Sequence, residues 1–585
     1  MSFPYQDPTL SPEQRTEDLL SRMETADKVG LMFQTMVTYG ELDTSGEFLI
    51  GPPLRSMVEE RRMSHFNIVG VGESPSDFVA WQNSAQRIAL AGPLGIPITF
   101  STDPRHAFTD NPATSMLAGP FSQWPETLGL AAVRSPELVR RFGDIVRKEY
   151  LAVGIRLALH PQIDLATEPR WARVNGTFGE DAELTSQLVA EYIRGMQGEE
   201  LGPESVSTMT KHFPGGGPQK DGEDPHFPYG REQVYPGGRF DYHLKPFRAA
   251  IAAGAAQMMP YYGMPIGTKY EEVAFGFNRG IVTGLLRDEL GFTGIVCTDW
   301  GILTDAGLGD SIMSARSWGV EHLTRPEKLL KAINAGVDQL GGEHCTDVLL
   351  DLVADDQVSV DRLDASARRL LLEKFRLGLF DNPFADEAHA EAVVGNTEHR
   401  EAGLEAQSRS VTVLTNDNGA NGTATLPLPR GIRVYAEGID DAVLADFAEP
   451  VASAAEADIA ILRVEAPYDH REGALEAYFH AGSLAFKQEQ IDHISAIAGQ
   501  VPTVLDVYLD RAAILTPLID HVAATVVNFG VSDIAFLRAL FGDCPPEGKL
   551  PFDMPRSMEA VEASDSDAPF STEHPLFSFG HGLTI

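Results

Sequence analysis

The chain has 585 residues, more than one hydrophobic core usually serves, so we expect two or more domains. Its composition, 43% hydrophobic and 22% charged residues, is that of a folded protein, and its formal net charge is -38. This excess of acidic residues argues against nucleic acid or an anionic membrane as a partner.

Cysteine usage and the N-terminal segment favour a reduced, cytoplasmic protein. Cys297, Cys345 and Cys544 show no CxxC or metal-ligand spacing, and so few thiols predict no disulfide framework. Residues 1–23 lack the basic and apolar regions of a secretory signal, and no run of about 18 apolar residues predicts a membrane span. We expect a cytoplasmic location, with secretion left open if the gene product begins earlier with a leader.

Short apolar runs alternate with helix-patterned stretches from about residue 90 to 345, which is typical of repeated βα units. One polar residue at the end of such a run is as easily the cap of the next helix. Several together fit the active-site face of a (β/α)8-type TIM barrel, which we predict as the N-terminal domain of this α/β chain. The residues that end the runs are Asp103, Asp164, Lys211 with His212, Tyr261 with Tyr262, and Asp299.

A second series of βα units begins near residue 405, and its near-continuous apolar runs predict a mostly parallel sheet in an α/β sandwich. The expected strands lie within 410–416, 431–438, 457–466, 502–510 and 523–530. The polar stretch before them is expected to be a linker. The predicted domains are therefore a catalytic barrel at 1–385, a linker at 386–404, and a sandwich at 405–585 that contributes to the active site.

Two loops of the predicted barrel carry cations suited to a ligand rich in hydroxyl groups. In KHFPGGG (211–217) no Gly-Lys-Ser/Thr follows the glycines, so a phosphate loop is disfavoured and a loop that approaches a ligand closely is favoured. A salt-bridged Lys211 and a structural His212 are the alternative. In EPRWARVNGTFGED (168–181), Arg173 could grip paired hydroxyls or a carboxylate, whereas Arg170 is expected to hold an acid of its own loop.

Five segments, taken in order, carry a resemblance to a known family. They are STD at 101–103, the two loops above, GLLRDELGFTGIVCTDWG at 284–301, and the tail GKLPFDMPRS…PLFSFGHGL at 548–583. Over essentially its full length the chain resembles glycoside hydrolase family 3, in the two-domain, β-glucosidase-like form. The resemblance implies a retaining, exo-acting β-glycosidase that releases terminal non-reducing β-D-glucosyl residues from a small glycoside or oligosaccharide.

The resemblance also leaves alternatives and assigns no cofactor. It is compatible with β-N-acetylhexosaminidase or β-xylosidase activity, and a catalytically silent sugar-binding protein is the alternative of another class. Neither a metal nor an organic cofactor is expected, because a retaining glycosidase works with two side chains about 5–5.5 Å apart. The oligomeric state is open, with a homo-oligomer as one option.

The site residues implied by the resemblance follow its motifs. Asp299 matches the nucleophile that forms the covalent glycosyl-enzyme, with Thr298 where the family has serine. Tyr261 falls near the nucleophile, and Trp300 would wall the sugar site unless it merely packs at the barrel rim. The residues expected to grip the hydroxyls of the terminal sugar are Asp103, Arg173, Lys211 and His212.

The acid/base is expected from the second domain, where Glu465 ends the third predicted strand. Glu472 and Glu476 follow closely and are alternatives. A rival lies in the barrel, where Asp224 and His226 resemble the Asp-His pair of the β-N-acetylhexosaminidases, although proline replaces the intervening serine.

Overall fold

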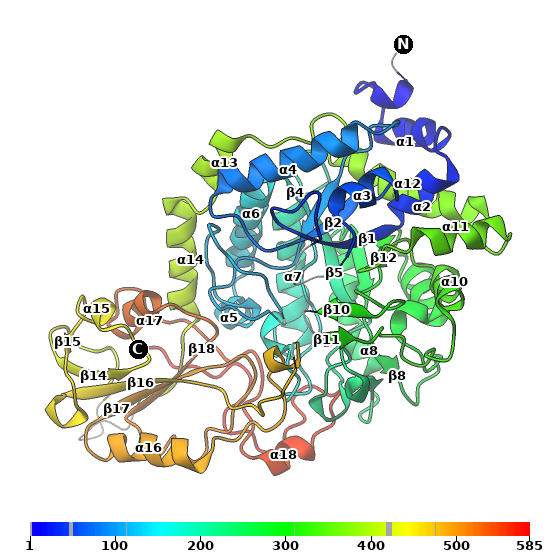
Figure 1. Ribbon diagram of the computed structural model, residues 1–585. Coiled ribbons are helices and arrows are strands. Elements are labelled where there is room, and N and C mark those ends of the chain that lie inside the picture. The colour runs from blue at the N-terminus through cyan, green and yellow to red at the C-terminus, as the bar shows by residue number, and fades with distance from the viewer. Residues whose placement is uncertain (1–2, 46–50, 113, 309–310, 417–423, 474) are drawn as a thin grey trace.

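The computed structural model describes residues 3–45, 51–112, 114–308, 311–416, 424–473 and 475–585, which form two α/β domains side by side (Figure 1). Among these residues no helix is both long and apolar enough to cross a membrane. One cluster of buried apolar side chains runs through both domains and includes Leu128 from the first and Phe529 from the second. The two domains therefore share a core as well as a surface contact.

The first domain is a closed barrel of parallel strands in the order β12-β1-β2-β3-β4-β5-β7-β9. A parallel bridge between Cys297 and Gln339 joins the ends of this sheet, and the Thr298 N–H donates to the Gln339 carbonyl at 2.9 Å. The strands are β1 Phe33–Thr38, β2 His65–Val69, β3 Thr99–Thr102, β4 Ile155–Ala158, β5 Ser207–Phe213, β7 Gln257–Pro260, β9 Ile295–Val296 and β12 Leu340–Gly341. The predicted (β/α)8-type barrel is confirmed, although its first two strands begin before the expected start near residue 90.

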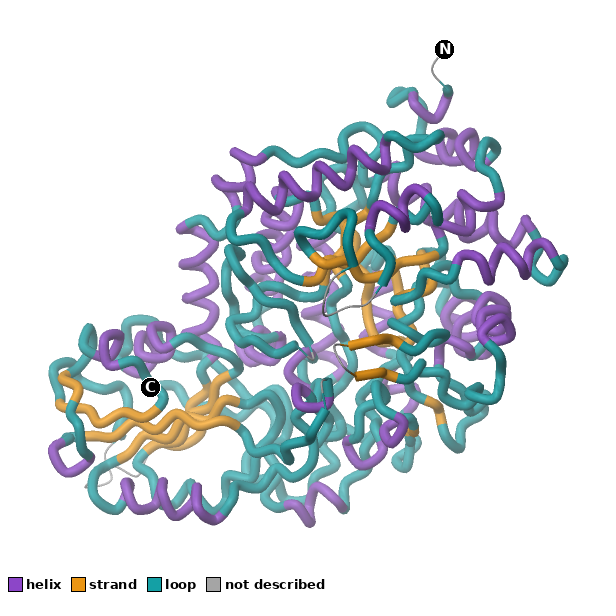
Figure 2. Tube along the Cα trace, viewed as in Figure 1, coloured by secondary structure: helices purple, strands orange, loops and turns teal. Residues whose placement is uncertain are grey.

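Helices surround the barrel strands, which lie at the centre of the domain in Figure 2. Sequence signals set their ends. The Asp181 carboxylate accepts from the Leu184 N–H at 2.7 Å and starts a helix that ends at Gln197, where Gly198, with φ +79°, caps it. The helices are α1 Pro12–Leu20, α2 Thr25–Leu31, α3 Leu54–Glu59, α4 Pro75–Leu90, α5 Thr127–Val133, α6 Pro136–Ala152, α7 Ala182–Gln197, α8 Phe240–His243, α9 Lys245–Ala252, α10 Arg325–Ala335, α11 Thr346–Ala354 and α12 Val360–Arg376. A π-helical segment spans Gly280–Glu289.

Two small sheets lie outside the barrel strands. Strands β6 Glu232–Gln233 and β8 Met264–Pro265 pair in parallel, and β10 Ala306–Leu308 and β11 Ser311–Met313 pair antiparallel. Both small sheets are formed by segments that follow barrel strands β5, β7 and β9. They therefore lie at the end of the barrel where the predicted site residues lie.

The second domain contains one sheet in the order β13-β18-β17-β16-β14-β15. Only β13 runs antiparallel to its neighbour, so the expected mostly parallel sheet is confirmed. Its strands are β13 Thr412–Thr415, β14 Arg433–Glu437, β15 Glu449–Pro450, β16 Ile459–Glu465, β17 Thr503–Tyr508 and β18 Ala524–Asn528, and only β15 was not expected. The helices are α15 Asp441–Leu444, α16 Gln488–Ala498, α17 Asp533–Leu540 and α18 Met558–Glu562, with α16 below the sheet and α15 and α17 above it in Figure 1.

The expected linker at 386–404 is helical. Helices α13 Glu387–Val393 and α14 Thr397–Ser410 occupy it, and the Asn396 side chain starts α14 by accepting from the His399 N–H at 2.9 Å. Helix α14 packs against α5 of the barrel and α17 of the second domain. The segment is therefore a packed connection, while the exact boundaries at 385 and 405 stay predictions.

Candidate active site

Predicted site residues from four different strands meet at one end of the barrel. Asp103 follows β3 directly, Lys211 and His212 lie near the end of β5, Tyr261 follows β7 and Asp299 follows β9 by three residues. Because parallel strands end at the same rim of a barrel, side chains far apart in the sequence come together there.

Asp299 has one oxygen held and the other free. It is 7% exposed, and its Oδ1 accepts the Trp300 N–H at 2.7 Å. Its Oδ2 is buried and accepts no hydrogen bond from the described residues, although His212 Nε2 lies 3.9 Å away. A buried carboxylate oxygen without a donor is uncommon and is available to a ligand. This geometry suits a nucleophile.

A buried chain of polar groups runs from Asp164 through His212 to Arg173. Asp164 Oδ2 lies 2.7 Å from His212 Nδ1, and His212 Nε2 lies 3.1 Å from Arg173 Nη1. Burial, together with Arg173, holds the pKa of His212 well below its usual value, so the imidazole is neutral. A neutral ring that donates from Nδ1 to Asp164 presents Nε2 as an acceptor to Arg173.

Arg173 is the permanent cation of the site. Burial works to lower its pKa, but Tyr261, Asp224 and Asp299 outweigh burial and raise the pKa above the usual value for arginine. Burial also raises the pKa of Asp164 to about 6, although the backbone N–H groups of Gly216 and His212, which donate to this carboxyl, work to lower it. Arg173 is therefore a fixed positive charge that interacts with Asp299.

Lys211 and Asp103 form an ion pair inside the site. Lys211 Nζ lies 2.8 Å from Asp103 Oδ1, and Asn67 Nδ2 donates to Asp103 Oδ2 at 3.1 Å. Burial opposes ionisation of Asp103, but Lys211 outweighs it and lowers the pKa of that carboxyl. The alternative of a salt-bridged lysine is thus realised, and both partners face the same end of the barrel as the other predicted residues.

Asp224 organises the wall of the site, a role that sequence reasoning missed. Its Oδ2 accepts from Trp171 Nε1 at 2.8 Å and from the Tyr261 hydroxyl at 3.0 Å. Its Oδ1 accepts from the His226 N–H at 2.9 Å and lies 2.6 Å from His226 Nδ1. The Tyr261 ring lies over His212, with the ring centres 4.3 Å apart. Tyr261 therefore lies in the site with its hydroxyl on Asp224 instead of Asp299.

Trp300 packs where the barrel closes. A side chain at Gly341 or Gly342 would place its Cβ within 2.9 Å of the Trp300 ring, and Gly342 has φ +71°, so only glycine fits there. The Trp300 carbonyl accepts from the Tyr262 hydroxyl at 2.7 Å, whereas its buried Nε1 has no partner among the described residues. The ring is held beside Asp299, as a wall of a sugar site would require.

The second domain reaches the site through residues 465–473 and 475–483. Arg471 makes a two-pronged ion pair with Glu223, both distances being 2.7 Å, and Tyr229 donates to Glu476 Oε1 at 2.9 Å. Phe479 lies against the His226 ring at 5.0 Å between centres. The segment therefore rests on the barrel loop that contains Asp224.

Arg511 is fully buried and holds this segment through backbone carbonyls. Its Nη1 donates to the Arg170 carbonyl of the barrel at 2.9 Å, and its Nη2 donates to the Pro467 carbonyl at 2.7 Å. The carbonyls of Gly482 and Ser483 accept as well. Arg170 itself pairs with Glu168 at 2.8 Å, as expected for a loop-holding arginine.

The expected acid/base candidates lie apart from Asp299. Glu465, at the end of β16, and Glu472 are exposed, and Glu476 is partly buried. Among the described residues no hydrogen bond or ion pair joins any of the three glutamates to Asp299. Glu465 instead lines a pocket of about 420 Å³ between the domains, the inter-domain pocket, whose lining includes Phe108, Thr109, Arg463, Tyr478, Asp506 and Tyr508.

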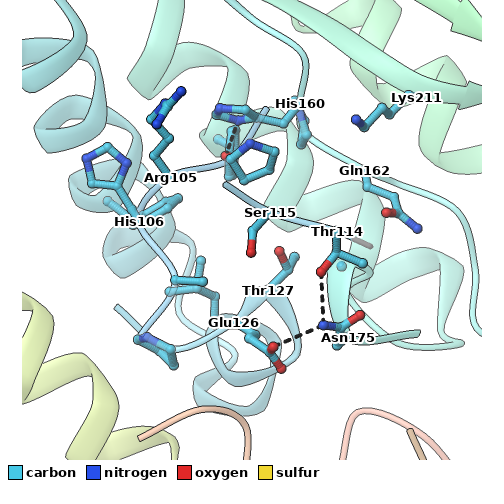
Figure 3. A pocket seen from close by; sticks show the side chains of 18 of the residues that line it. Arg105, His106, Thr114, Ser115, Glu126, Thr127, His160, Gln162, Asn175 and Lys211 are labelled. Carbon is cyan, nitrogen blue, oxygen red and sulfur yellow. Dashed lines mark hydrogen bonds between the residues drawn. The ribbon is translucent and has the colours of Figure 1, made fainter. Parts of the chain in front are cut away.

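A second, smaller cavity of about 50 Å³ has Lys211 in its lining (Figure 3). Glu126 and Asn175 line it, and Asn175 Nδ2 donates to Glu126 Oε1 at 3.0 Å. The same oxygen accepts from Thr109 at 2.6 Å and from Tyr508 of the second domain at 2.7 Å. Burial raises the pKa of Glu126 to about 6, despite these donors. Glu126 thus connects the barrel rim to the inter-domain pocket.

Comparison with known proteins identifies the family. The model described as "Glycosyl hydrolase family 3 N terminal domain" matches residues 57–372, and that described as "Glycosyl hydrolase family 3 C-terminal domain" matches residues 382–585. The chain belongs to glycosyl hydrolase family 3. It is therefore a glycoside hydrolase, and the resemblance seen in its motifs is confirmed.

Curated members of family 3 match almost the whole chain. Beta-glucosidase C of Emericella nidulans is 50% identical over 584 residues, which are 99% of this chain and 93% of that protein. The periplasmic beta-glucosidase/beta-xylosidase of Dickeya chrysanthemi is 40% identical over 99% of this chain and 91% of its own.

Solved structures of more distant proteins share the fold. A β-glucosidase from Erythrobacter marinus superposes with a TM-score of 0.78 at 22% identity, covering 100% of this chain and 84% of that one. An exo-1,3/1,4-beta-glucanase from a Pseudoalteromonas species gives 0.78 at 21% identity and covers 100% and 97%. These likenesses support the two-domain family 3 fold.

Proposed function

We propose that this family 3 enzyme is a retaining, exo-acting β-glucosidase that releases terminal non-reducing β-D-glucosyl residues. The observation that carries the proposal is the buried Oδ2 of Asp299, which accepts no hydrogen bond from the described residues. It lies at the end of the barrel, 3.9 Å from the His212 ring that contacts Arg173. The 50% identity to a β-glucosidase over nearly the full chain supports glucose as the sugar.

In the proposed reaction, Asp299 Oδ2 attacks the anomeric carbon while the bond to the leaving oxygen breaks. An acid protonates that oxygen, and a covalent glycosyl-enzyme forms on Asp299. The same group, now a base, takes a proton from water, which attacks the anomeric carbon and frees Asp299. No metal or cofactor takes part in this scheme.

The proposed roles of the other residues follow from their charges and partners. Asp103 accepts from sugar hydroxyls while Lys211 and Arg173 donate to them, since each keeps capacity beyond its protein partner. His212 fixes the orientation of Arg173 through its Nε2. Tyr261 packs on His212, and Trp300 closes the side of the sugar ring.

For the acid/base we propose the second-domain segment 465–483, with Glu465 as first candidate and Glu472 and Glu476 as alternatives. The contacts of Arg471 and Phe479 with the barrel loop support this segment, because they hold it at the site. His226 is the rival. Burial lowers its pKa, despite Asp224, and this disfavours the protonated form that an acid needs at neutral pH.

A second candidate activity is that of a β-xylosidase. It is favoured by the printed name of the Dickeya chrysanthemi relative, which covers both sugars. Xylose lacks the hydroxymethyl group of glucose, so one pocket frame can hold either ring.

A panel of aryl β-glucoside, β-xyloside, β-galactoside and β-N-acetylglucosaminide substrates tests the proposed function. We expect the highest kcat/KM with the glucoside and formation of the β-anomer of glucose as the first product, detected by NMR. A dominant N-acetylglucosaminide activity would contradict the proposal and favour His226 as acid/base. If the protein hydrolyses none of these substrates, the alternative of a catalytically silent sugar-binding protein is favoured.

A further inference from the structure

The nucleophile segment, defined as residues 298–304, lies alongside β12 at the point where the barrel closes. Before Asp299, the Thr298 hydroxyl oxygen accepts from the Gly341 N–H at 2.9 Å. After Asp299, the Gly301 N–H donates to the Gly341 carbonyl at 3.0 Å. The backbone of one neighbouring strand therefore holds the segment on both sides of Asp299.

Glu343, two residues beyond β12, holds the end of the nucleophile segment with its side chain. Its Oε1 accepts from the Leu303 N–H at 2.8 Å and from the Thr304 N–H at 3.1 Å. Leu303 and Thr304 belong to no helix or strand. One carboxylate oxygen therefore binds two successive N–H groups at a place where strand pairing has already ended.

The surroundings of Glu343 are unfavourable for a carboxylate. The residue is 1% exposed, and among the described residues it forms no ion pair; the Cys345 thiol lies 4.0 Å from its Oε2. Burial raises the pKa of Glu343 to about 7, although Thr304 and the Leu303 N–H work to lower it. Because a buried carboxylate without a cationic partner adds little stability, its presence is better explained by the segment that it holds.

Other contacts hold the nucleophile segment from the loop that it leads into. The Arg316 N–H donates to the Gly301 carbonyl at 3.0 Å, and the Ser317 hydroxyl donates to the Ile302 carbonyl at 2.8 Å. Both donors lie in the loop that follows β11, whereas Glu343 lies next to a strand of the barrel wall. Glu343 therefore anchors the end of the segment to the barrel itself.

We propose that Glu343 is a positioning residue for the reaction. By holding Leu303 and Thr304 at β12, its carboxylate fixes the segment that contains Asp299 and keeps Oδ2 of that residue aimed at the anomeric carbon. A misplacement of about 1 Å in a reacting group can cost about 100-fold in rate. The inference rests on the proposed function, because it takes Asp299 as the nucleophile.

The rate at which Asp299 becomes glycosylated measures this role directly. With 2,4-dinitrophenyl 2-deoxy-2-fluoro-β-D-glucoside, Asp299 Oδ2 bonds to the anomeric carbon and dinitrophenolate departs with the bonding electron pair. This leaving group needs no acid, and the fluorine slows hydrolysis, so the glycosyl-enzyme accumulates. Inactivation of the full-length protein gives a maximal rate constant and a half-saturating concentration.

Three variants separate the acceptor oxygen of Glu343 from its charge. Glu343→Ala removes the acceptor, Glu343→Asp withdraws it by one methylene, and Glu343→Gln keeps an acceptor oxygen of the same reach. Glu373→Ala is the matched control, because Glu373 is 7% exposed and burial raises its pKa to about 7. Its partners Ser207 and Gln257 begin β5 and β7, at the end of the barrel opposite Asp299.

We expect the maximal rate constant of inactivation to fall about 10–100-fold in Glu343→Ala and about 5–20-fold in Glu343→Asp. Glu343→Gln should stay within about threefold of the natural chain, because both N–H groups keep their acceptor. The half-saturating concentration should change less than about twofold, since Asp103 and Lys211 lie on other strands. Glu373→Ala should lower the thermal midpoint and leave the rate constant unchanged.

An unchanged rate constant in Glu343→Asp and Glu343→Ala, with only a lower thermal midpoint, would make Glu343 a merely structural residue and overturn the proposal. An equal loss in Glu343→Gln or in Glu373→Ala would also overturn it, because the acceptor at β12 would not be what matters. If Glu343→Ala does not fold, the aspartate and glutamine variants decide in the same way.

Mass spectrometry of the inactivated natural chain separates this inference from the proposed function. If the fluoroglucosyl label is absent from Asp299 in the natural chain, the nucleophile assignment itself fails. If the label is present on Asp299 but the Glu343 variants react at the natural rate, only the positioning role is refuted.

Discussion

His212 Nε2 lies 3.9 Å from Asp299 Oδ2, while Nδ1 of the same ring lies 2.7 Å from Asp164 Oδ2. The imidazole thus stands between two carboxylates, yet burial and Arg173 keep it neutral. It follows that Arg173, and not His212, balances the charge of Asp299. Asp299 keeps Oδ2 free because the neighbouring His212 already contacts Asp164 through Nδ1 and Arg173 through Nε2.

Replacing Asp299 with asparagine should abolish turnover and leave the fold intact. The amide cannot attack an anomeric carbon, so we expect kcat for an aryl β-glucoside to fall at least about 10³-fold. Circular dichroism and the thermal midpoint should match those of the natural chain. Asp288→Asn, at an exposed acid of the same βα unit, serves as the control, and near-normal activity of Asp299→Asn would refute the assignment.

Glu465→Gln should show the signature of a missing acid/base. We expect kcat/KM to fall about 10²–10⁴-fold for substrates with poor leaving groups, and far less for a dinitrophenyl β-glucoside, which needs no protonation. Azide should restore the rate and yield a β-glucosyl azide. The same measurements are made on Glu472→Gln, Glu476→Gln and His226→Ala. If one of these variants, and not Glu465→Gln, shows the leaving-group dependence and the azide rescue, that residue is the acid/base.

Removing the Tyr261 hydroxyl should have a moderate effect. The hydroxyl donates to Asp224 at 3.0 Å, so Tyr261→Phe leaves the ring on His212 and costs one buried hydrogen bond. We expect kcat/KM to fall about 5–20-fold, consistent with about 1–2 kcal/mol. A loss as large as that of Asp299→Asn would show instead that the hydroxyl contacts the nucleophile during reaction.

Glu126→Gln should make the enzyme less sensitive to pH. The pKa of Glu126 is raised from 4.5 to about 6, so its contribution to stability is complete below pH 4.5 and is lost as the pH rises through about 6. Glutamine resembles the protonated form and keeps one acceptor for Thr109, Asn175 and Tyr508. We expect the variant to equal the natural chain near pH 4.5 and to exceed its stability by about 2 kcal/mol at pH 7.

Thermal unfolding across this pH range measures the Glu126 effect as the difference between variant and natural chain. Glu204→Gln, at an exposed glutamate, should give no such pH-dependent difference. If the Glu126→Gln difference is flat from pH 4.5 to 7, Glu126 has the same pKa in the folded and the unfolded chain and the raised pKa is wrong.

Much of the fold was predictable because its signals are local. The apolar runs that end at Asp103, Lys211 and Asp299 predicted both the strands and the shared rim. Strands β1 and β2 were missed because buried polar residues such as Gln34 and Asn67 interrupt their apolar pattern. The helices in the expected linker were missed although Asp386 and Asn396 are ordinary N-cap residues.

The parts of the site that sequence could not predict depend on contacts between distant segments. Asp224 lies in a loop, and its partners Trp171 and Tyr261 come from two other loops. No spacing in the sequence therefore predicts that Asp224 bonds to both. The position of Glu465 relative to Asp299 depends on how the second domain docks. That docking is set by pairs such as Arg471 with Glu223, which pattern reasoning along one domain does not reveal.

Arg511 also sets a rule for exchanging parts between relatives. Its guanidinium binds backbone carbonyls of Arg170 in the barrel and of Pro467, Gly482 and Ser483 in the second domain, so it depends on loop shape and not on side-chain identity. A chimaera that grafts another member's C-terminal domain onto this barrel must therefore bring an arginine at the position of Arg511 that can reach the Arg170 carbonyl of the barrel. The barrel loop at Arg170 and the second-domain segment held by Arg511 therefore have to match each other when domains are exchanged between relatives.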